Sequence, residues 1–304
     1  MKIYEHDMGV GCLQYTVEQD GVCISGWRGN GRSVSVPEEI EGQPVTGVGR
    51  KAFLSKKNLR EIVLPVSLRS LGDWAFAYCN NLERVTVPAG CFDIGRTLFL
   101  DCDRLECISG IRPGSGAGGE AWSESCGRLL AAAVTRLDAY YLLEPGAVGS
   151  PEWLRKWDAR LEAVMRADDG EGYSKQVLCG EEDYGSTDMG AYLRAARQKK
   201  AGLAMLRLKC DQGLAPDMRQ YLEQYLRTHT KGCESEESWQ VILAQGESHP
   251  EDVQLFLRLG CAGRENIEAM ISQMREDQPQ LRAAFLRYQQ EQLGHGDFFA
   301  GLSL

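Results

Sequence analysis

The sequence has no apolar run of about 18 residues, the length that a membrane-spanning helix needs. The N-terminal stretch MKIYEHDMGVGCLQY contains no apolar segment after its first charges, so we expect no signal peptide. Both absences predict a cytoplasmic protein without a membrane span. A cell-surface location stays open if residues that once preceded Met1 have been removed.

Basic charge is also scarce. The chain carries 34 Lys and Arg against 43 Asp and Glu, a net charge of −9. Residues 1–111 hold 12 basic against 14 acidic side chains, and residues 112–304 hold 22 against 29. Because neither half is basic, binding to a nucleic-acid backbone is disfavoured.

The 11 cysteines are odd in number and include no C-x-x-C pair. Secreted disulfide scaffolds are shorter and more regularly spaced, so we expect reduced thiols that pack as small apolar groups.

Recognisable catalytic and metal-binding motifs are missing as well. The four histidines, His6, His229, His249 and His295, do not form an H-E-x-x-H motif or lie beside a cysteine at ligand spacing. G-x-S-x-G, G-x-x-x-x-G-K-[ST] and the kinase signatures are absent too. We therefore predict no catalytic residue, no metal and no cofactor, and interpret the acidic stretch 181–183 as a solvated loop.

What the sequence does contain is a 23-residue repeat. The same residue type recurs at this spacing in several columns, namely Phe53, Phe76 and Phe99; Leu59, Leu82 and Leu105; Gly49, Gly72 and Gly95; Pro65 and Pro88; and Cys79 and Cys102. One such unit cannot close a core, because its apolar edges are covered only by its neighbours. The spacing thus predicts a solenoid.

Each repeat position has an expected role. The L-x-x-I/V-x-L/V element predicts a short strand, and the proline after it ends that strand. We expect the glycine to allow a bend with positive φ, and the Ala-Phe pair to fill the interior opposite the strand.

Two segments, LREIVLPVSLRSLGDWAFAYCN and LERVTVPAGCFDIGRTLFLDCD, carry the complete pattern. The earlier stretch VPEEIEGQPVTGVGRKAFLSKKN matches in part, with a five-residue insertion between Pro37 and Pro65. Residues 13–111 resemble the BspA-type leucine-rich repeat family. That resemblance implies a curved solenoid and is associated with protein-binding and cell-surface roles.

The flanking segments complete the predicted α+β organisation. LQYTVEQDGVCISGW, upstream of the repeats, alternates around Asp20-Gly21 and predicts a hairpin that caps the N-terminal end of the solenoid. We predict a repeat domain at 1–111, a glycine-rich linker at 112–119 and an all-helical domain at 120–304. The linker contains G-x-G-x-x-G, but outside the strand–turn–helix setting of a nucleotide-binding loop.

The second half has helical periodicity. SPEWLRKWDARLEAVMRA predicts a helix with Ser150 as N-cap and Pro151 at its first position, and a core face that includes Trp153 and Trp157. We expect further helices near 188–209 and after Pro216. Pairs of helices recur near the C-terminus, where Pro250 and Pro279 are separated by the same interval as Phe256 and Phe285. The last pair resembles a hairpin of an ankyrin-like array.

The strand residues that point away from the core form the candidate partner-binding surface. Two columns follow from the spacing: Ser33, Glu61, Arg84 and Cys107, and Ser35, Val63, Thr86 and Ser109. Arg84 is the strongest candidate, because arginine is enriched at binding hot spots. Cys107 is either an exposed thiol in this surface or is covered by the helical half.

These observations predict a non-enzymatic module that binds a protein partner. Two alternatives stay open. One is an enzyme or effector with an active site in the helical half, for instance at Cys179 or Cys210. The other is a cell-surface adhesin.

Overall fold

The computed structural model describes residues 2–112, 119–171, 173 and 188–294. Its contacts divide the chain into two compact units, Met1–Ala163 and Val164–Leu304. The first unit contains all the strands and the second is helical. Each is described below by itself, and the division into three domains at 112–119 stays a prediction.

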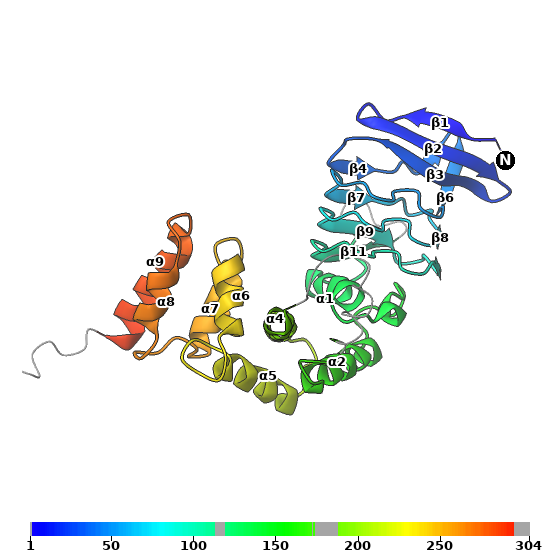
Figure 1. Cartoon of the computed structure of the whole chain (residues 1–304). Helices are drawn as coiled ribbons and strands as arrows, with labels where there is room; N and C mark the ends of the chain where they lie inside the picture. Colours follow the sequence, from blue (N-terminus) through cyan, green and yellow to red (C-terminus); the bar gives the residue numbers. More distant parts are fainter. Residues whose placement is uncertain (1, 113–118, 172, 174–187, 295–304) are drawn as a thin grey trace, which may run out of the picture. The chain divides into compact units, whose positions relative to one another are not determined.

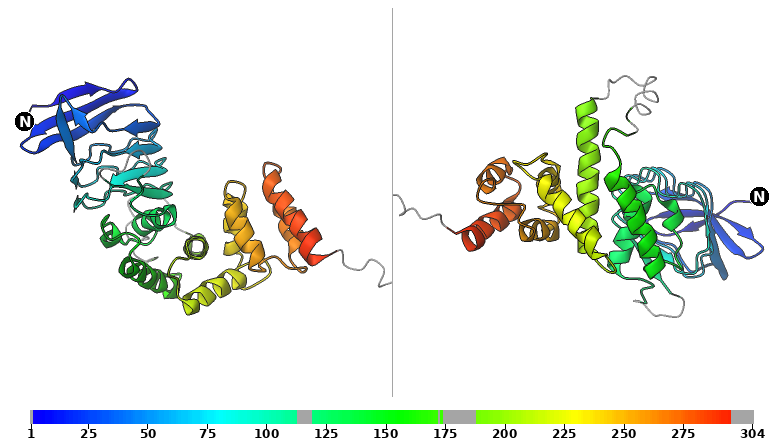
Figure 2. Two further views of the ribbon diagram at one scale, coloured as in Figure 1. Left: turned by 180° about the vertical axis from the view of Figure 1, so that it is seen from behind. Right: turned by 90° about the horizontal axis from the view of Figure 1, so that it is seen from below.

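The first unit is a β-solenoid of about four turns (Figures 1 and 2). Its strands are β1 (Tyr4–Asp7), β2 (Gly11–Glu18), β3 (Gly21–Gly29), β4 (Ser33–Ser35), β5 (Glu39–Ile40), β6 (Gln43–Val48), β7 (Glu61–Val63), β8 (Ser70–Leu71), β9 (Arg84–Pro88), β10 (Asp93–Ile94) and β11 (Cys107–Ile111).

Two parallel ladders run along the solenoid. β4, β7, β9 and β11 form a four-stranded sheet, which Figure 1 shows as successive rungs. β6, β8 and β10 pair in parallel on another side of each coil. Arg84 pairs with Glu61 and with Cys107, and Asp93 pairs with Ser70, so every step equals one repeat of the sequence. The predicted 23-residue spacing is therefore the spacing of the coils.

A stack of aromatic rings fills the interior of the coils. Phe76 lies between Phe53 and Phe99, with ring centroids 5.4 Å and 5.6 Å apart. Trp27 extends the stack at 6.4 Å from Phe53. Because these rings sit at one repeat position, each coil places its ring on the ring of the coil before.

The repeat glycines have a different structural role from the one predicted. Gly49, Gly72 and Gly95 do not have a positive φ, so the expectation of a left-handed bend was wrong. A methyl group added at Gly72 would lie 2.5 Å from the backbone nitrogen of Arg50 and 2.7 Å from the carbonyl carbon of Gly49. Glycine is needed here because adjacent coils approach backbone to backbone.

The left-handed conformation occurs instead at two neighbouring columns of residues with side chains. Both columns keep the spacing of the repeat, and their φ values lie between 51° and 61°; they are Lys51, Trp74 and Thr97, and Ser55, Tyr78 and Asp101. Such backbone is costly for a residue with a Cβ, so the hydrogen bonds between coils have to hold it in place.

Both ends of the solenoid are covered. β2 and β3 pair antiparallel, which confirms the predicted hairpin, and β3 continues the sheet to β6. At the other end, helix α1 (Glu124–Thr135) packs on β11, and the Trp122 Nε1 donates to the Ile108 carbonyl at 2.9 Å. The Ala121 amide donates to Gly110 at 2.8 Å, so the open edge of β11 is partly paired.

The predicted linker largely lies outside the described residues, since 113–118 are not described. Its flanks are joined, because the Arg112 amide donates to the Gly119 carbonyl at 3.1 Å and Ile111 bridges to Glu120. Ile111 and Glu120 therefore lie side by side as an antiparallel pair.

Helix α2 (Pro151–Arg166) follows a 3₁₀ turn, η1 (Tyr140–Leu142). The Ser150 hydroxyl accepts from the Trp153 amide at 3.2 Å, which confirms the predicted N-cap. Trp153 and Trp157 are buried, and their indole nitrogens donate to the carbonyls of Leu142 and Leu129. Both tryptophans therefore belong to the core.

The helices that follow are α4 (Met189–Lys209), α5 (Pro216–Thr228), α6 (Glu237–Gln245), α7 (Pro250–Arg258), α8 (Ile267–Gln273) and α9 (Pro279–Tyr288), with a π-helical turn η2 (Gln289–Leu293). With α1 and α2, the described residues thus contain eight α-helices. Proline begins α5, α7 and α9, as the sequence predicts.

The last four helices form two hairpins that lie side by side (Figures 1 and 2). Trp239 of α6 packs against Phe256 and Phe285, the two phenylalanines that mark the repeat of the hairpins. The Glu247 carboxylate accepts from the amides of Gln280 and Leu281 at 3.2 Å and 2.9 Å, so one hairpin caps the final helix of the next. These contacts explain why the hairpins repeat in sequence.

Candidate functional site

The sheet of β4, β7, β9 and β11 brings the eight predicted side chains into two adjacent columns. In the first, Ser33 lies opposite Glu61, Glu61 opposite Arg84, and Arg84 opposite Cys107. The second consists, in the same order, of Ser35, Val63, Thr86 and Ser109. We call these eight residues the sheet face. That they bind a partner stays a prediction.

The sheet face is open over its first three strands. Ser33, Glu61 and Arg84 are exposed, and Val63 and Thr86 are half-buried. The Ser33 hydroxyl donates to the Glu61 carboxylate at 3.4 Å, while Arg84 makes no ion pair within the residues that the structure covers. An exposed guanidinium without a carboxylate partner is available to a binding protein.

Cys107 is the exception in this surface, because α1 covers it. Its exposure is 3%, and a methyl group added at Gly127 of α1 would lie 2.8 Å from its Sγ. Burial raises the pKa of the Cys107 thiol, and Glu124 adds to the rise, while Ser109, Arg84 and Arg128 oppose it. The structure decides between the two alternatives for this residue: it is covered, whereas Ser109 in the neighbouring column is half-buried like Val63 and Thr86.

The thiols of the repeat column are packed in the same way. The Cys79 Sγ lies 3.0 Å from the Phe53 carbonyl oxygen, and the Cys102 Sγ lies 3.1 Å from that of Phe76. Burial raises the pKa of Cys79 to about 11 and that of Cys102 to about 12. These cysteines are structural, as their repeat position predicts.

We expect the cysteines to react very unequally with iodoacetamide at pH 8. Among the cysteines that the structure describes, Cys233 is the exposed one, so it should be alkylated before the others of this set. Cys79, with a pKa of about 11, has only about one thiol in a thousand ionised at this pH, and it is buried as well. Peptide mass spectrometry over a time course measures the order. Labelling of Cys79 or Cys107 as fast as Cys233 would show that the coils open in the native state.

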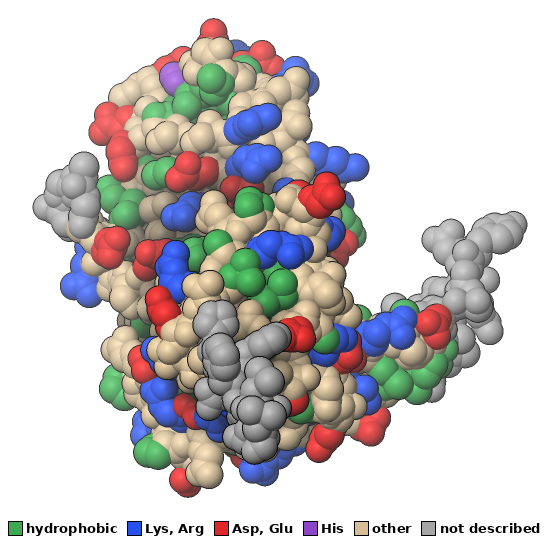
Figure 3. Space-filling view, turned by 90° about the vertical axis from the view of Figure 1, so that its left-hand side faces the viewer, with side chains coloured by type: hydrophobic (Ala, Val, Ile, Leu, Met, Phe, Trp, Pro, Cys, Tyr) green, Lys and Arg blue, Asp and Glu red, His purple; other side chains and the backbone are tan. Residues whose placement is uncertain are grey.

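On the face of the molecule that Figure 3 shows, charges of both signs are interspersed. Lys and Arg side chains alternate with Asp and Glu, and hydrophobic side chains occur in small groups.

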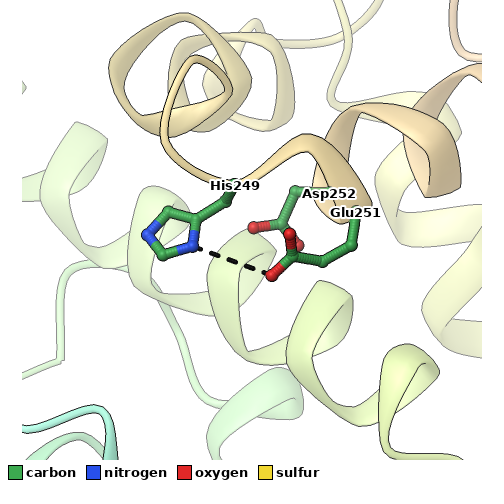
Figure 4. Close-up of side chains that lie close together, drawn as sticks. All are labelled: His249, Glu251 and Asp252. Carbon is green, nitrogen blue, oxygen red and sulfur yellow. Dashed lines mark ion pairs between the residues drawn. The ribbon is translucent and has the colours of Figure 1, made fainter.

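One group of possible metal ligands lies in the described part of the chain. His249, Glu251 and Asp252, at the start of α7, place one ligand atom each within 4.8 Å of one another (Figure 4). The Lys209 ammonium, however, lies 2.6 Å from Asp252 and 3.5 Å from Glu251. The lysine supplies the positive charge that these carboxylates need, so we interpret the group as an ion-pair cluster that ties α4 to α7.

A second charged cluster has a structural explanation too. Asp169, which follows α2, accepts from Arg197 and Lys200 of α4, both at 2.7 Å. Burial favours a higher pKa for Asp169, but the hydrogen bonds from these two cations outweigh it and lower the pKa. The cluster fixes the turn after α2 against α4.

The cysteines proposed for an enzyme do not gain support. Cys179 lies outside the described residues. Cys210 is buried at the end of α4, where its carbonyl accepts from the buried Arg207 side chain. Burial raises the pKa of Cys261 to about 12, which makes that thiol a poor nucleophile.

The sequence did not predict that α1 closes the sheet face. The sequence did contain a signal for this contact, because Trp122 and the glycines at 110 and 127 lie close to the start of a helix. A methyl group at Gly110 would collide with the Trp122 ring. These residues let the indole and the helix approach β11, but only the three-dimensional structure identifies them as partners.

Comparison with known proteins supports the repeat part alone. Residues 33–115 match the model of the BspA type leucine rich repeat region, in six copies, which confirms the predicted resemblance over that range. No curated protein matches the chain. The ankyrin-like resemblance of the C-terminal hairpins is not found and stays a prediction.

Solved structures of bacterial leucine-rich repeat proteins cover about a third of this chain. A leucine-rich repeat protein from T. pallidum is 34% identical over 34% of this chain and 49% of its own, with a TM-score of 0.32. A leucine rich cell surface protein from Faecalibacterium prausnitzii is 23% identical over 36% and 31%, with a TM-score of 0.31. A leucine-rich repeat protein from Bacteroides ovatus is 26% identical over 36% of this chain and 30% of its own, with a TM-score of 0.29. The chain thus spans half or less of the length of these proteins.

Proposed function

We propose that the chain is a non-enzymatic protein-interaction module and that its partner binds the exposed part of the sheet face. The observation that carries this proposal is the pair of columns formed by Ser33, Glu61 and Arg84 and by Ser35, Val63 and Thr86. They lie in register on three rigid strands. Apart from one hydrogen bond between Ser33 and Glu61, no side-chain contact between these six described residues explains why they are there.

The chemistry of the two columns suits a protein partner. Arg84 offers five donors in a fixed plane. Thr86 beside it on β9, and Ser35 two strands away on β4, are small enough to let another main chain approach. The stacked coils already hold the strands of this sheet in place, so binding costs little conformational entropy. A mixed surface of this kind favours a partner that presents a carboxylate to Arg84.

An affinity capture with matched variants tests the proposal. We expect Arg84→Glu and the double variant Arg84→Glu/Thr86→Glu to lose the partner that the wild type retains, with affinity reduced at least about tenfold. Arg69→Glu is the control, because it makes the same charge change at an exposed corner on the other side of the coil. Retention of every partner by the double variant would contradict the proposal.

The cellular location is part of the same proposal. Among the residues that the structure describes, no helix is both long and apolar enough to cross a bilayer. We propose that the module acts in the cytoplasm. Labelling of the native protein on intact cells by a membrane-impermeant reagent would support the adhesin alternative instead.

A further inference from the structure

The coils turn toward the sheet at four corners, which lie one above another. These corners, residues 27–32, 55–60, 78–83 and 101–106, lead into β4, β7, β9 and β11, and we call them the corner ridge. Side chains link neighbouring corners. Asn58 is bonded to Asn30 at 3.4 Å, Asn81 donates to the Lys57 carbonyl at 2.8 Å, and Asn80 to that of Asp101 at 3.1 Å.

Charge changes sign along this ridge. The first corner carries two basic side chains, Arg28 and Arg32, and no acidic one. The second corner carries three basic side chains, Lys56, Lys57 and Arg60, and again no acidic one. The third has only an acidic residue, Glu83, and the fourth has three acidic residues, Asp101, Asp103 and Glu106, against Arg104. Two of these charges are paired within the chain, Arg28 with Glu5 at 3.1 Å and Arg60 with Glu83 at 2.6 Å. The remaining charges leave the first two corners basic and the fourth corner, at the other end of the ridge, acidic.

The sign change is visible at equivalent positions of the repeat. Lys57 and Asp103 occupy one column, two coils apart, and so do Arg60 and Glu106. Burial raises the pKa of both buried thiols of the ridge, but Lys56 opposes the rise at Cys79 whereas Asp103 and Asp101 add to the rise at Cys102. Because the backbone follows the same path in each coil of the repeat, these differences in charge come from the side chains alone.

The charged groups of the ridge reach solvent. Lys57, Asp101, Asp103 and Glu106 are exposed. Near the middle, the Tyr78 side chain is 43% exposed, next to the amides of the half-buried asparagines at 80 and 81. The centre of the ridge thus offers an amphipathic ring and hydrogen-bonding groups, while its ends carry opposite charge.

We propose that a second copy of this chain binds along the corner ridge in antiparallel orientation. A two-fold rotation about the middle of the ridge places the basic corners of each copy opposite the acidic corners of the other. The first corner then faces the partner's fourth, the second faces its third, and the two Tyr78 rings meet near the axis. Such an interface is self-complementary, as a two-fold dimer requires. A parallel arrangement would place each corner opposite the same corner of the other copy. It is excluded because the like charges would repel.

The size of the ridge sets the strength of this dimer. Coils repeat at about 4.8 Å, so four corners span about 14 Å, and the buried area is at the low end for specific interfaces. Association should therefore be weak and transient. Because its charges lie near solvent, it should weaken further as salt is added.

Two variants that remove the difference in charge between the ends of the ridge test the proposal on the full chain. The acidic variant is Arg32→Glu/Ser55→Asp/Lys57→Asp, and the basic variant is Asp101→Ser/Asp103→Lys/Glu106→Arg. Each new residue already occurs in the same column of another coil, so each is compatible with the local backbone, including the left-handed positions 55 and 101. Circular dichroism of each variant, compared with that of the wild type, checks that both fold.

Sedimentation equilibrium in low and high salt then measures self-association. We expect wild type to dimerise in low salt and to dissociate in 0.5 M NaCl, a concentration of about three times physiological ionic strength. Each variant alone should dimerise at least about tenfold more weakly, and a mixture of the two should regain association as a heterodimer. The control Arg69→Glu/Asp93→Lys, away from the ridge, should behave as wild type.

Three outcomes would overturn the proposal. They are a wild type that stays monomeric in low salt at the highest soluble concentration, variants that dimerise as well as the wild type, and a mixture that associates no better than its components. Failure of this test would not affect the proposed partner binding, which depends on Arg84 and Thr86 of the sheet face.

Discussion

Gly72→Ala is expected to destabilise the solenoid by about 3 kcal/mol or more, although it adds a single methyl group. That group would lie 2.5 Å from the Arg50 nitrogen, 2.7 Å from the Gly49 carbonyl carbon and 3.0 Å from the Arg50 Cα. These are backbone atoms of the preceding coil, so no side chain can rotate away. The coils have to separate, which weakens the hydrogen bonds and the aromatic stack that join them. Urea unfolding followed by circular dichroism measures the loss.

Gly90→Ala is the matched control for this prediction. Gly90 lies in the next coil and is exposed, a methyl group there would meet no atom within 4 Å, and its φ is not positive. The same substitution should therefore be neutral or stabilise by up to about 1 kcal/mol, because alanine reduces the freedom of the unfolded chain. Equal destabilisation by both variants would show that close approach of the coils is not the reason for the glycine column.

The repeat could be predicted from the sequence because one spacing determines all of its contacts. Once Phe53, Phe76 and Phe99 are recognised as one column, every residue that lies one repeat away from another must occupy an equivalent place. The register of Glu61 with Arg84 and of Val63 with Thr86 follows from this rule and is confirmed by the strand pairing. Proline at the start of α5, α7 and α9 is an equally local signal.

The features that could not be predicted depend on distances between segments. A glycine is compatible both with a positive φ and with close packing, and only the separation of adjacent coils identifies the second reason at Gly72. Cys107 occupies an outward position by the repeat rule, yet α1 buries it. The side chains of the sheet face were predictable, but the extent of the open surface was not, since it is set by the contact of Gly127 with Cys107.

Phe76→Ala is expected to have the largest effect of any single substitution in the core, about 3–5 kcal/mol. The ring is fully buried and lies between Phe53 and Phe99, so its removal leaves a cavity and interrupts a stack in both directions. Collapse cannot close this cavity, because the spacing of the coils is fixed by their backbone hydrogen bonds, for example from the Phe53 amide to the Ala75 carbonyl at 2.8 Å. Thermal unfolding monitored by near-UV and far-UV circular dichroism measures both the loss of stability and the loss of ring packing.

Phe92→Ala controls for the loss of a phenylalanine as such. Its side chain is 77% exposed at the corner before β10, so the free energy of unfolding should change by no more than about 0.5 kcal/mol. Comparing the free energies of unfolding of the two variants shows whether the stacked rings stabilise the repeat or whether the backbone ladders alone do so. If Phe76→Ala unfolded at the same temperature as Phe92→Ala, the parallel ladders and the capping by α1 would have to hold the coils together without the stack.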